Sequence, residues 1–118
     1  MRTGDSRCPF AGLGLGLDQP PAPIAATLAL ATGVWSVTFD RQLEPGGLAL
    51  GNWTFRATGF AFVTDTAVAA GSVVSGTSTQ DAIDPGDDVA NYAATPADVL
   101  GLTGLPAAAF TDFPLVVT

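Results

Sequence analysis

Residues 33–56 read GVWSVTFDRQLEPGGLALGNWTFR and contain both tryptophans of the chain. In the first half, Trp35, Val37 and Phe39 alternate with smaller or polar residues. This period of two is typical of a strand with one buried face and one exposed face. The alternation resumes at Trp53, after a connection that holds a Pro-Gly-Gly turn. The stretch therefore predicts two strands joined by a long connection.

Similar alternation continues on both sides of this stretch, with turn residues between the apolar runs. Strands are predicted over 24–30, 34–40, 52–58, 60–63, 72–79, 89–94 and 108–117. Pro114 places the last of them at an edge or a bulge. A short helix over 96–102 is also expected, because Thr95-Pro96 is typical of a helix start. About seven short strands predict an all-β domain over residues 23–118, an Ig-like antiparallel β-sandwich.

Residues 1–22 differ from this domain, because they are rich in Gly and Pro and show neither a helical nor a strand period. Such a segment can be a loose leader. Alternatively, strand-like alternation in Gly12–Leu17 puts leucines along one edge, a pattern suited to lying on another chain. We expect an extended arm that docks on neighbouring subunits of a homo-oligomer or larger assembly, through Phe10, Leu13, Leu15 and Leu17.

The charge of the chain argues against several classes of partner. The formal net charge is −7, and the four positive residues are arginines with no basic stripe among them. Phosphate backbones would be repelled, so nucleic-acid binding is not expected. No apolar run approaches the roughly 20 residues that span a bilayer, and the start lacks the pattern of an export signal. We therefore expect neither a nucleic-acid nor a membrane partner.

The composition also argues against catalysis. The chain has no histidine and no lysine, and Cys8 is its only cysteine. Nucleophiles activated by histidine, Schiff bases and phosphate-binding lysines cannot be built from these residues. Only carboxylates remain for acid-base chemistry, and no pair of them is singled out by its spacing. The chain is expected not to be an enzyme.

Two features leave a binding role open. The acidic run Asp81, Asp84, Asp87 and Asp88 could supply oxygen ligands to a calcium ion, but its spacing is not the EF-hand pattern and a solvated acidic turn is the preferred interpretation; no other cofactor is expected. The aromatic residues Trp35, Trp53, Phe55, Phe60 and Phe62 could form a platform for a sugar, but at strand spacing such residues more often form the core.

The order of these features resembles the Ig-like repeats of large bacterial surface proteins, in particular the SwmB-type repeat. The matching pieces are Val37-Thr38-Phe39-Asp40, Leu43-Glu44-Pro45-Gly46, Asn52-Trp53-Thr54, Asn91-Tyr92 and the segment 104–117. The resemblance covers residues 24–118 and extends to small Ig-like proteins that decorate the particles of tailed phages.

The resemblance implies a non-enzymatic structural protein. A single copy with its own arm and without an export signal favours a virion component, such as a head decoration or a minor capsid or tail protein that binds other coat subunits. The alternative is an Ig-like adhesion module of a bacterial surface or secreted protein, located outside the cell.

Overall fold

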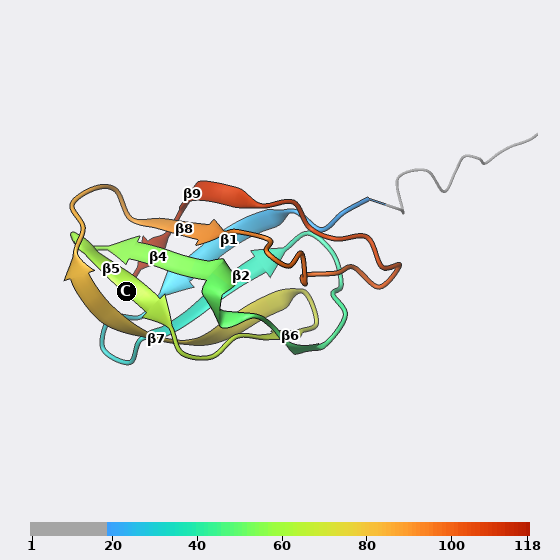
Figure 1. The fold of residues 1–118 in the computed structure, drawn as a ribbon, viewed down its shortest axis with the longest axis horizontal. Coiled ribbons are helices and arrows are strands. Elements are labelled where there is room, and N and C mark those ends of the chain that lie inside the picture. Colours follow the sequence, from blue (N-terminus) through green and yellow to red (C-terminus); the bar gives the residue numbers. More distant parts are fainter. Residues whose placement is uncertain (1–18) are drawn as a thin grey trace, which may run out of the picture.

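A computed structural model describes residues 19–118 of the chain, and all of its regular structure apart from one 3-10 turn is β (Figure 1). The turn, η2, covers Leu50–Asn52. The strands are β1 (Pro23–Leu28), β2 (Val34–Phe39), β3 (Gly46–Gly47), β4 (Trp53–Ala57), β5 (Phe60–Thr64), β6 (Val68–Ala70), β7 (Val73–Ile83), β8 (Val89–Tyr92), β9 (Phe110–Pro114) and β10 (Val116–Val117).

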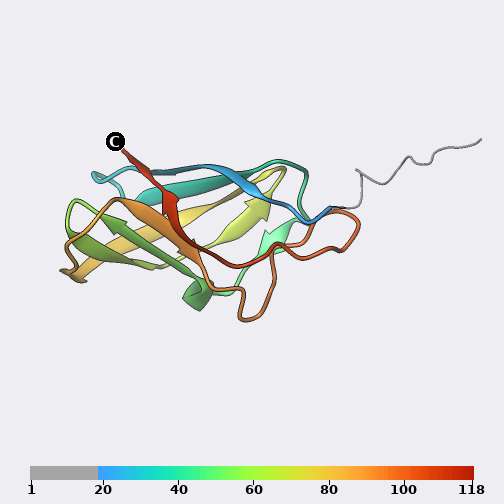
Figure 2. The same cartoon turned by 90° about the horizontal axis from the view of Figure 1, so that it is seen from above.

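The strands form one mixed sheet that nearly closes on itself. Its main order is β10-β1-β2-β7-β5-β4-β8-β9, and the short strands β3 and β6 extend it beside β7. All pairs are antiparallel except β10 on β1, which are parallel. The two ends of this order, β9 and β10, are consecutive in the chain and are separated only by the buried Leu115. Figure 2 shows the resulting two faces of strands around a common interior.

The long strand β7 joins two groups of strands in the sheet: β10, β1, β2 and β6 on one side, and β5, β4, β8 and β9 on the other. Its first half pairs with β2 and β6, from Val73 to Thr77, and its second half pairs with β5, from Ser78 to Ile83. Gly76 lies next to this change of partner, where its backbone approaches Thr66 so closely that a Cβ would stand 1.8 Å from the Thr66 carbonyl oxygen. A residue without a side chain is therefore required where β7 passes from one part of the sheet to the other.

The core is a stack of aromatic rings from several strands. Trp35 lies 5.3 Å from Trp53 and 4.8 Å from Phe55, and Trp53 lies 4.6 Å from Tyr92, all between ring centroids. These four side chains are almost fully buried. Burial of each large ring is worth about 1.5–3 kcal/mol or more, and the offset packing of the rings adds to it. This stack joins β2, β4 and β8 into one interior.

The all-β prediction is confirmed, and the alternation at Trp35, Val37 and Phe39 points these side chains inward as expected. The strands of four residues or more are β1, β2, β4, β5, β7, β8 and β9, which correspond to the predicted strands. The short strands β3 and β6 were not predicted, and the parallel pairing of β10 departs from a purely antiparallel sheet.

The helix predicted over 96–102 is wrong. This segment is irregular, and its Leu100 and Gly101 form isolated bridges with Pro106 and Leu43. Within the part of the chain that the structure describes, no helix is long and apolar enough to span a membrane.

Candidate functional site

The acidic run lies at one end of the molecule, where β7 ends and the chain turns into β8 (Figure 1). Asp81 belongs to β7, and the other three aspartates lie in the turn or directly at its end. Arg56 covers this turn: its Nε donates to the Asp87 carbonyl oxygen at 2.9 Å, and its Nη1 lies 3.7 Å from Asp84 Oδ2. Asp88 Oδ1 accepts from the Thr58 N–H at 2.9 Å.

These contacts give the acidic turn partners from within the protein. Among residues 19–118, no three acidic, histidine or cysteine side chains form a group that could hold a metal ion. The calcium site therefore stays a prediction.

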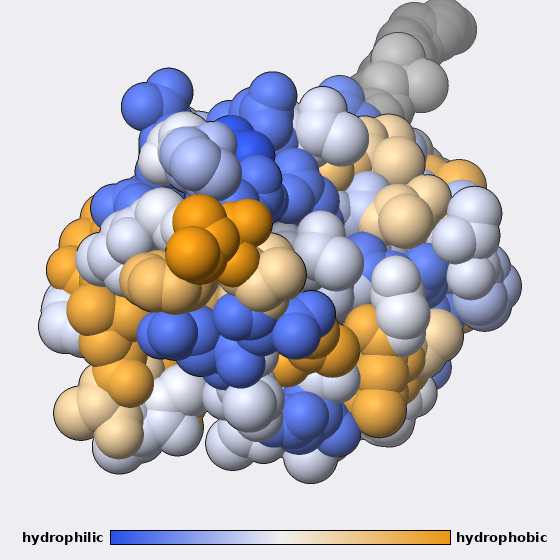
Figure 3. Space-filling model, turned by 60° about the vertical axis from the view of Figure 1, so that its left-hand side comes forward, coloured by the Kyte–Doolittle hydropathy of each residue, from blue (hydrophilic) through white to orange (hydrophobic). Residues whose placement is uncertain are grey.

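Figure 3 looks toward this end of the molecule and shows apolar side chains in separate groups, divided by hydrophilic ones.

The aromatic residues are assigned by the structure to the core. Trp35, Trp53, Phe55 and Phe62 are buried, and Phe60 is half-buried against them. The faces of the four buried rings are not available to stack on a sugar, so the core interpretation is confirmed for them, and the half-buried Phe60 packs against the same core.

The opposite end of the molecule carries residues 19–22, the last part of the segment predicted to be an arm, and we call these residues the arm base. The predicted arm anchors Phe10, Leu13, Leu15 and Leu17 lie outside the described residues. The described chain begins at Gln19 and enters β1 at the end of the molecule farthest from the C-terminal Thr118, as Figures 1 and 2 both show.

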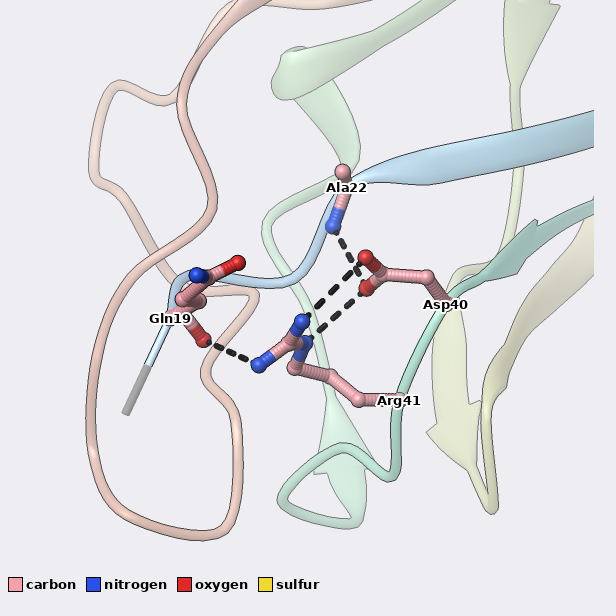
Figure 4. Close-up of polar contacts among 4 residues, drawn as sticks. All are labelled: Gln19, Ala22, Asp40 and Arg41. Carbon is pink, nitrogen blue, oxygen red and sulfur yellow. Dashed lines mark hydrogen bonds and ion pairs between the residues drawn. The ribbon is translucent and has the colours of Figure 1, made fainter. Parts of the chain in front are cut away.

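An ion pair holds the base of the arm (Figure 4). Arg41 Nε and Nη2 donate to the two carboxylate oxygens of Asp40 at 3.0 and 3.3 Å. The third nitrogen, Nη1, donates to the carbonyl oxygen of Gln19 at 3.0 Å. Asp40 Oδ1 also accepts from the Ala22 N–H at 3.0 Å, and the Asp40 N–H donates to the Ala22 carbonyl at 2.9 Å. We call these four residues the arm clamp.

The electrostatics of the arm clamp favour its charged form. The hydrogen bond from Arg41, followed by that from the Ala22 backbone, lowers the pKa of Asp40. The same pairing raises the pKa of Arg41. A charge-assisted two-point contact between guanidinium and carboxylate also has a fixed geometry. Both groups are thus charged at neutral pH, and together they fix the path of the chain from Gln19 to Ala22.

The prolines between Gln19 and Ala22 restrict this path further. Pro20 and Pro21 have fixed φ angles and no N–H to satisfy. Pro21 lies beside the loop that joins β8 to β9, since a Cβ on Gly101 would stand 3.5 Å from its ring. The arm base is therefore held between the arm clamp and this loop.

The loop between β8 and β9 is itself fastened by a buried polar group. Asn52 Nδ2 donates to the Pro96 carbonyl at 2.7 Å and to Asp98 Oδ1 at 3.1 Å, and Asn52 Oδ1 accepts from the Thr95 N–H at 2.8 Å. The Tyr92 hydroxyl donates to Asp98 Oδ1 at 3.1 Å. Burial raises the pKa of Tyr92, so its hydroxyl stays protonated and remains a donor.

The same hydroxyl accepts the backbone N–H groups of Asp98, at 3.0 Å, and Val99, at 3.1 Å. Asp98 Oδ2 accepts from the N–H of Ala49, the residue directly before η2. We call Asn52, Tyr92 and Asp98 the loop hub. Its hydrogen bonds join the loop, η2 and the end of β8, and Gly101 of the same loop lies beside Pro21.

Sequence analysis missed both the arm clamp and the loop hub. Asp40-Arg41 is an ordinary pair of neighbouring charges, and Asn52 was interpreted as a strand start. The sequence Thr95-Pro96 followed by Asp98 is typical of a helix start, so the segment that contains Asp98 was wrongly predicted as a helix. Only the pairing of distant segments identifies these residues, because Asn52 and Asp98 are 46 positions apart.

Comparison with protein-family models, with curated proteins and with solved structures finds no match for the chain.

Proposed function

We propose that the chain is a non-enzymatic structural protein of a virus particle, a head decoration or minor capsid or tail protein of a phage. It docks through the arm of residues 1–22 and displays the β domain of residues 23–118. The observation that carries this proposal is the arm clamp, which gives the arm a fixed point of departure from a rigid domain.

The proposed domain is an Ig-like sandwich. Its support is the inward alternation of the strands on either side of the aromatic stack, with Trp35 and Phe39 from β2 and Trp53 and Phe55 from β4. The passage of β7 from β2 to β5 is compatible with a sandwich whose two sheets share a strand at one corner.

The placement of the chain ends supports docking by one end and display by the other. The described chain starts at Gln19 in the arm clamp at one end of the domain, whereas Thr118 and the acidic turn lie at the far end (Figure 1). An arm that leaves one end can bind a neighbouring subunit without covering the other end. Weak contacts of this kind become strong when an assembly repeats them many times.

Composition supports a role without catalysis, since the chain offers neither histidine nor lysine. The net charge of −7 also keeps a particle surface that carries many copies soluble.

The location of the protein tests this proposal. Cultures of the organism that carries the gene are separated into cell-envelope, medium and virus-particle fractions, the last purified on a density gradient. A specific antibody then detects the protein in each fraction. We expect it in the particle fraction, in a constant ratio to the major coat protein. Detection in the envelope fraction alone would overturn the proposal and favour the surface adhesion module.

A variant tests the role of the arm. Leu13→Ser, Leu15→Ser and Leu17→Ser together remove three of the four predicted arm anchors and change no residue of the described domain. We expect the unaltered protein to sediment with particles that lack it, and the triple variant to stay in the supernatant. The matched control, Leu102→Ser, changes an exposed leucine in the loop between β8 and β9 and should bind normally. Equal binding of the triple variant would show that the arm is not the docking element.

A further inference from the structure

The second half of β7 leaves one edge of the sheet without a partner strand. On one side, β7 pairs with β6 and then with β5 along nearly its whole length. On the other side, β2 pairs with it only as far as Thr77, and a last backbone bond joins the Ser78 N–H to the Gly33 carbonyl at 2.8 Å. Among residues 19–118, no further strand pairs with β7 on this side. We call Thr79–Ile83 the open edge.

Backbone groups of the open edge point to its unpaired side. Successive residues of a strand turn their N–H and C=O groups to alternate sides. The Ser78 N–H is bonded on the side of β2, whereas the Thr77 N–H donates to Thr66 Oγ1 at 2.9 Å on the other side. The N–H and C=O of Gln80, two residues after Ser78, therefore point to the unpaired side. All five residues of the open edge are exposed, so a further strand can reach them.

The other edges of the sheet are short or interrupted. β3 and β10 have two residues each. β9 ends at Pro114 and contains Asp112, whose φ is +56°. The outer edge of β1 begins at Pro23, beside a shift of register. Prolines and bulges of this kind protect an edge from added strands, because they interrupt the ladder. The open edge has neither a proline nor a residue of positive φ.

Apolar side chains and carboxylates flank the open edge. Val63 lies opposite Thr79 on β5 and is 49% exposed, and Ile83 is 75% exposed. Asp81 belongs to the edge itself, and the other aspartates of the acidic turn follow it directly. The segment that best fits this edge is therefore extended, carries apolar side chains, and has positive charge at the end that meets the acidic turn.

The sequence of the arm has these properties. Gly12–Leu17 alternates glycine with leucine over six residues, close to the five residues of the open edge. No charged residue lies between Arg7 and Asp18. Ahead of this run stand Arg2 and Arg7 with only Asp5 against them, whereas the chain from Asp18 onward has two arginines and ten acidic residues. The start of the arm is thus the part of the chain with an excess of positive charge.

We propose that Gly12–Leu17 of one copy adds to the open edge of a second copy as an antiparallel strand. This inference rests on the arm of the proposed function and names its partner. Addition of an extended segment to an exposed sheet edge is a common mode of recognition.

Charge selects the antiparallel direction. With Gly12 opposite Ile83, Arg7 extends past the end of the open edge to the acidic turn, and Asp18 stays away from it. In the parallel direction, Asp18 would lie against the aspartates of the turn. The attraction between Arg7 and these carboxylates offsets part of the repulsion between two copies that each carry a charge of −7.

The arm of the same copy cannot reach this position. Gln19 is bound to Arg41, just beyond the end of β2, whereas Thr79 lies beyond Val34 at the start of β2. The six residues of β2 span about 20 Å. The link from Leu17 to Gln19 spans at most about 7 Å. The strand must therefore come from another copy, and with one arm and one open edge per copy the contact repeats head to tail, as a chain or a ring.

Mixing two variants tests the proposal. The triple arm variant with Leu13→Ser, Leu15→Ser and Leu17→Ser keeps the open edge, and Gln80→Pro keeps the arm but removes the N–H that points to the unpaired side. In sedimentation velocity up to millimolar concentration, we expect the parent chain to form oligomers larger than a dimer. Each variant alone should associate at least about tenfold more weakly. An equimolar mixture should form one-to-one dimers and nothing larger, because only one arm and one edge remain intact.

Gln80→Ala is the matched control, since it shortens the same side chain but keeps the N–H, and it should associate like the parent chain. A synthetic peptide of residues 1–18 keeps the test decisive if Gln80→Pro folds poorly by circular dichroism. The peptide should bind the triple arm variant, more weakly with added salt because screening reduces its attraction to the acidic turn. A mixture of folded variants that stays monomeric, or a peptide that does not bind at millimolar concentration, would overturn the inference.

Failure of this inference differs from failure of the proposed function. A parent chain that stays monomeric overturns the inference, while binding of the arm to particles is measured separately with the triple arm variant and Leu102→Ser. A protein that is absent from particles overturns the proposed function, while purified copies that assemble through the open edge still support the inference.

Discussion

Removing one hydroxyl from the loop hub provides a quantitative test of the structure. The substitution Tyr92→Phe keeps the ring in the aromatic stack but removes an oxygen that accepts two backbone N–H groups and donates to Asp98 Oδ1. The Val99 N–H is buried, so it cannot bind water in exchange. An orphaned buried donor costs about 1–3 kcal/mol, and the lost bond to a charged acceptor adds to this. We expect a loss of about 3 kcal/mol in the free energy of unfolding.

Urea denaturation measures this loss as a shift of the midpoint at constant slope. For a domain of this size, about 3 kcal/mol also lowers the Tm by roughly 10–20 °C. Thr103→Ala is the matched control, since it removes an exposed hydroxyl from the same loop and should change stability by no more than about 0.5 kcal/mol. Amide exchange at Val99 reports whether the loop opens alone. If Tyr92→Phe costs less than about 1 kcal/mol and the Val99 amide stays protected, the loop hub does not hold the loop as argued.

Three further predictions follow from other contacts. The pKa of Asp40 is lowered in the folded protein, so the stability that its charged form contributes is present above the ordinary pKa, near 3.9, and is lost as the pH falls through the lower pKa of the folded state. The Ala22 amide should therefore gain protection from hydrogen exchange as the pH rises through this range. Asp40→Asn should abolish this pH dependence of the Ala22 protection. Gly76→Ala should cost more than about 3 kcal/mol, because the new Cβ would stand 1.8 Å from the Thr66 carbonyl oxygen, whereas Gly47→Ala, with nothing within 4 Å, should be tolerated; equal thermal unfolding of the two variants would contradict this. Calcium at 1 mM should leave the Tm unchanged, because Asp84 and Asp88 have partners in Arg56 and Thr58; a rise of several degrees that EDTA reverses would instead establish the calcium site.

Local patterns were sufficient to predict the strands of four residues or more, but neither the short strands β3 and β6 nor the partners of any strand. The alternation at Trp35, Val37 and Phe39 reflects burial on one face of a single strand, which depends on neighbours in the sequence. The extension of β7 to Ile83 was missed, because exposed residues such as Gln80 and Asp81 follow no apolar period where the strand passes beyond the core. The parallel pairing of β10 was missed for a different reason: two residues carry no pattern, and their position follows from where the rest of the sheet ends.

The candidate site was hidden from sequence analysis because its residues act on distant backbone. Arg41 could be paired with Asp40 from their adjacency, but its bond to the Gln19 carbonyl joins residues 22 positions apart. Backbone acceptors leave no mark in the sequence, since every residue has one. The same holds for Asn52, whose acceptor at Pro96 is a carbonyl in a loop.

The direction of β1 connects the arm clamp to the function proposed for the arm. β1 starts at Pro23, directly after the clamped residue Ala22, and runs toward the far end of the molecule, between β2 and β10 (Figure 1). A pull on the arm along this axis acts parallel to β1, so it loads the hydrogen bonds to β2 and β10 together. A pull across the strand would instead break them one after another. The arm clamp ties Gln19 and Ala22 to Arg41 and Asp40, which directly follow β2, so the segment before β1 is fastened to the same strand that β1 pairs with. An arm that binds a particle, as proposed, would therefore pass its load to the domain through this clamped segment and β1.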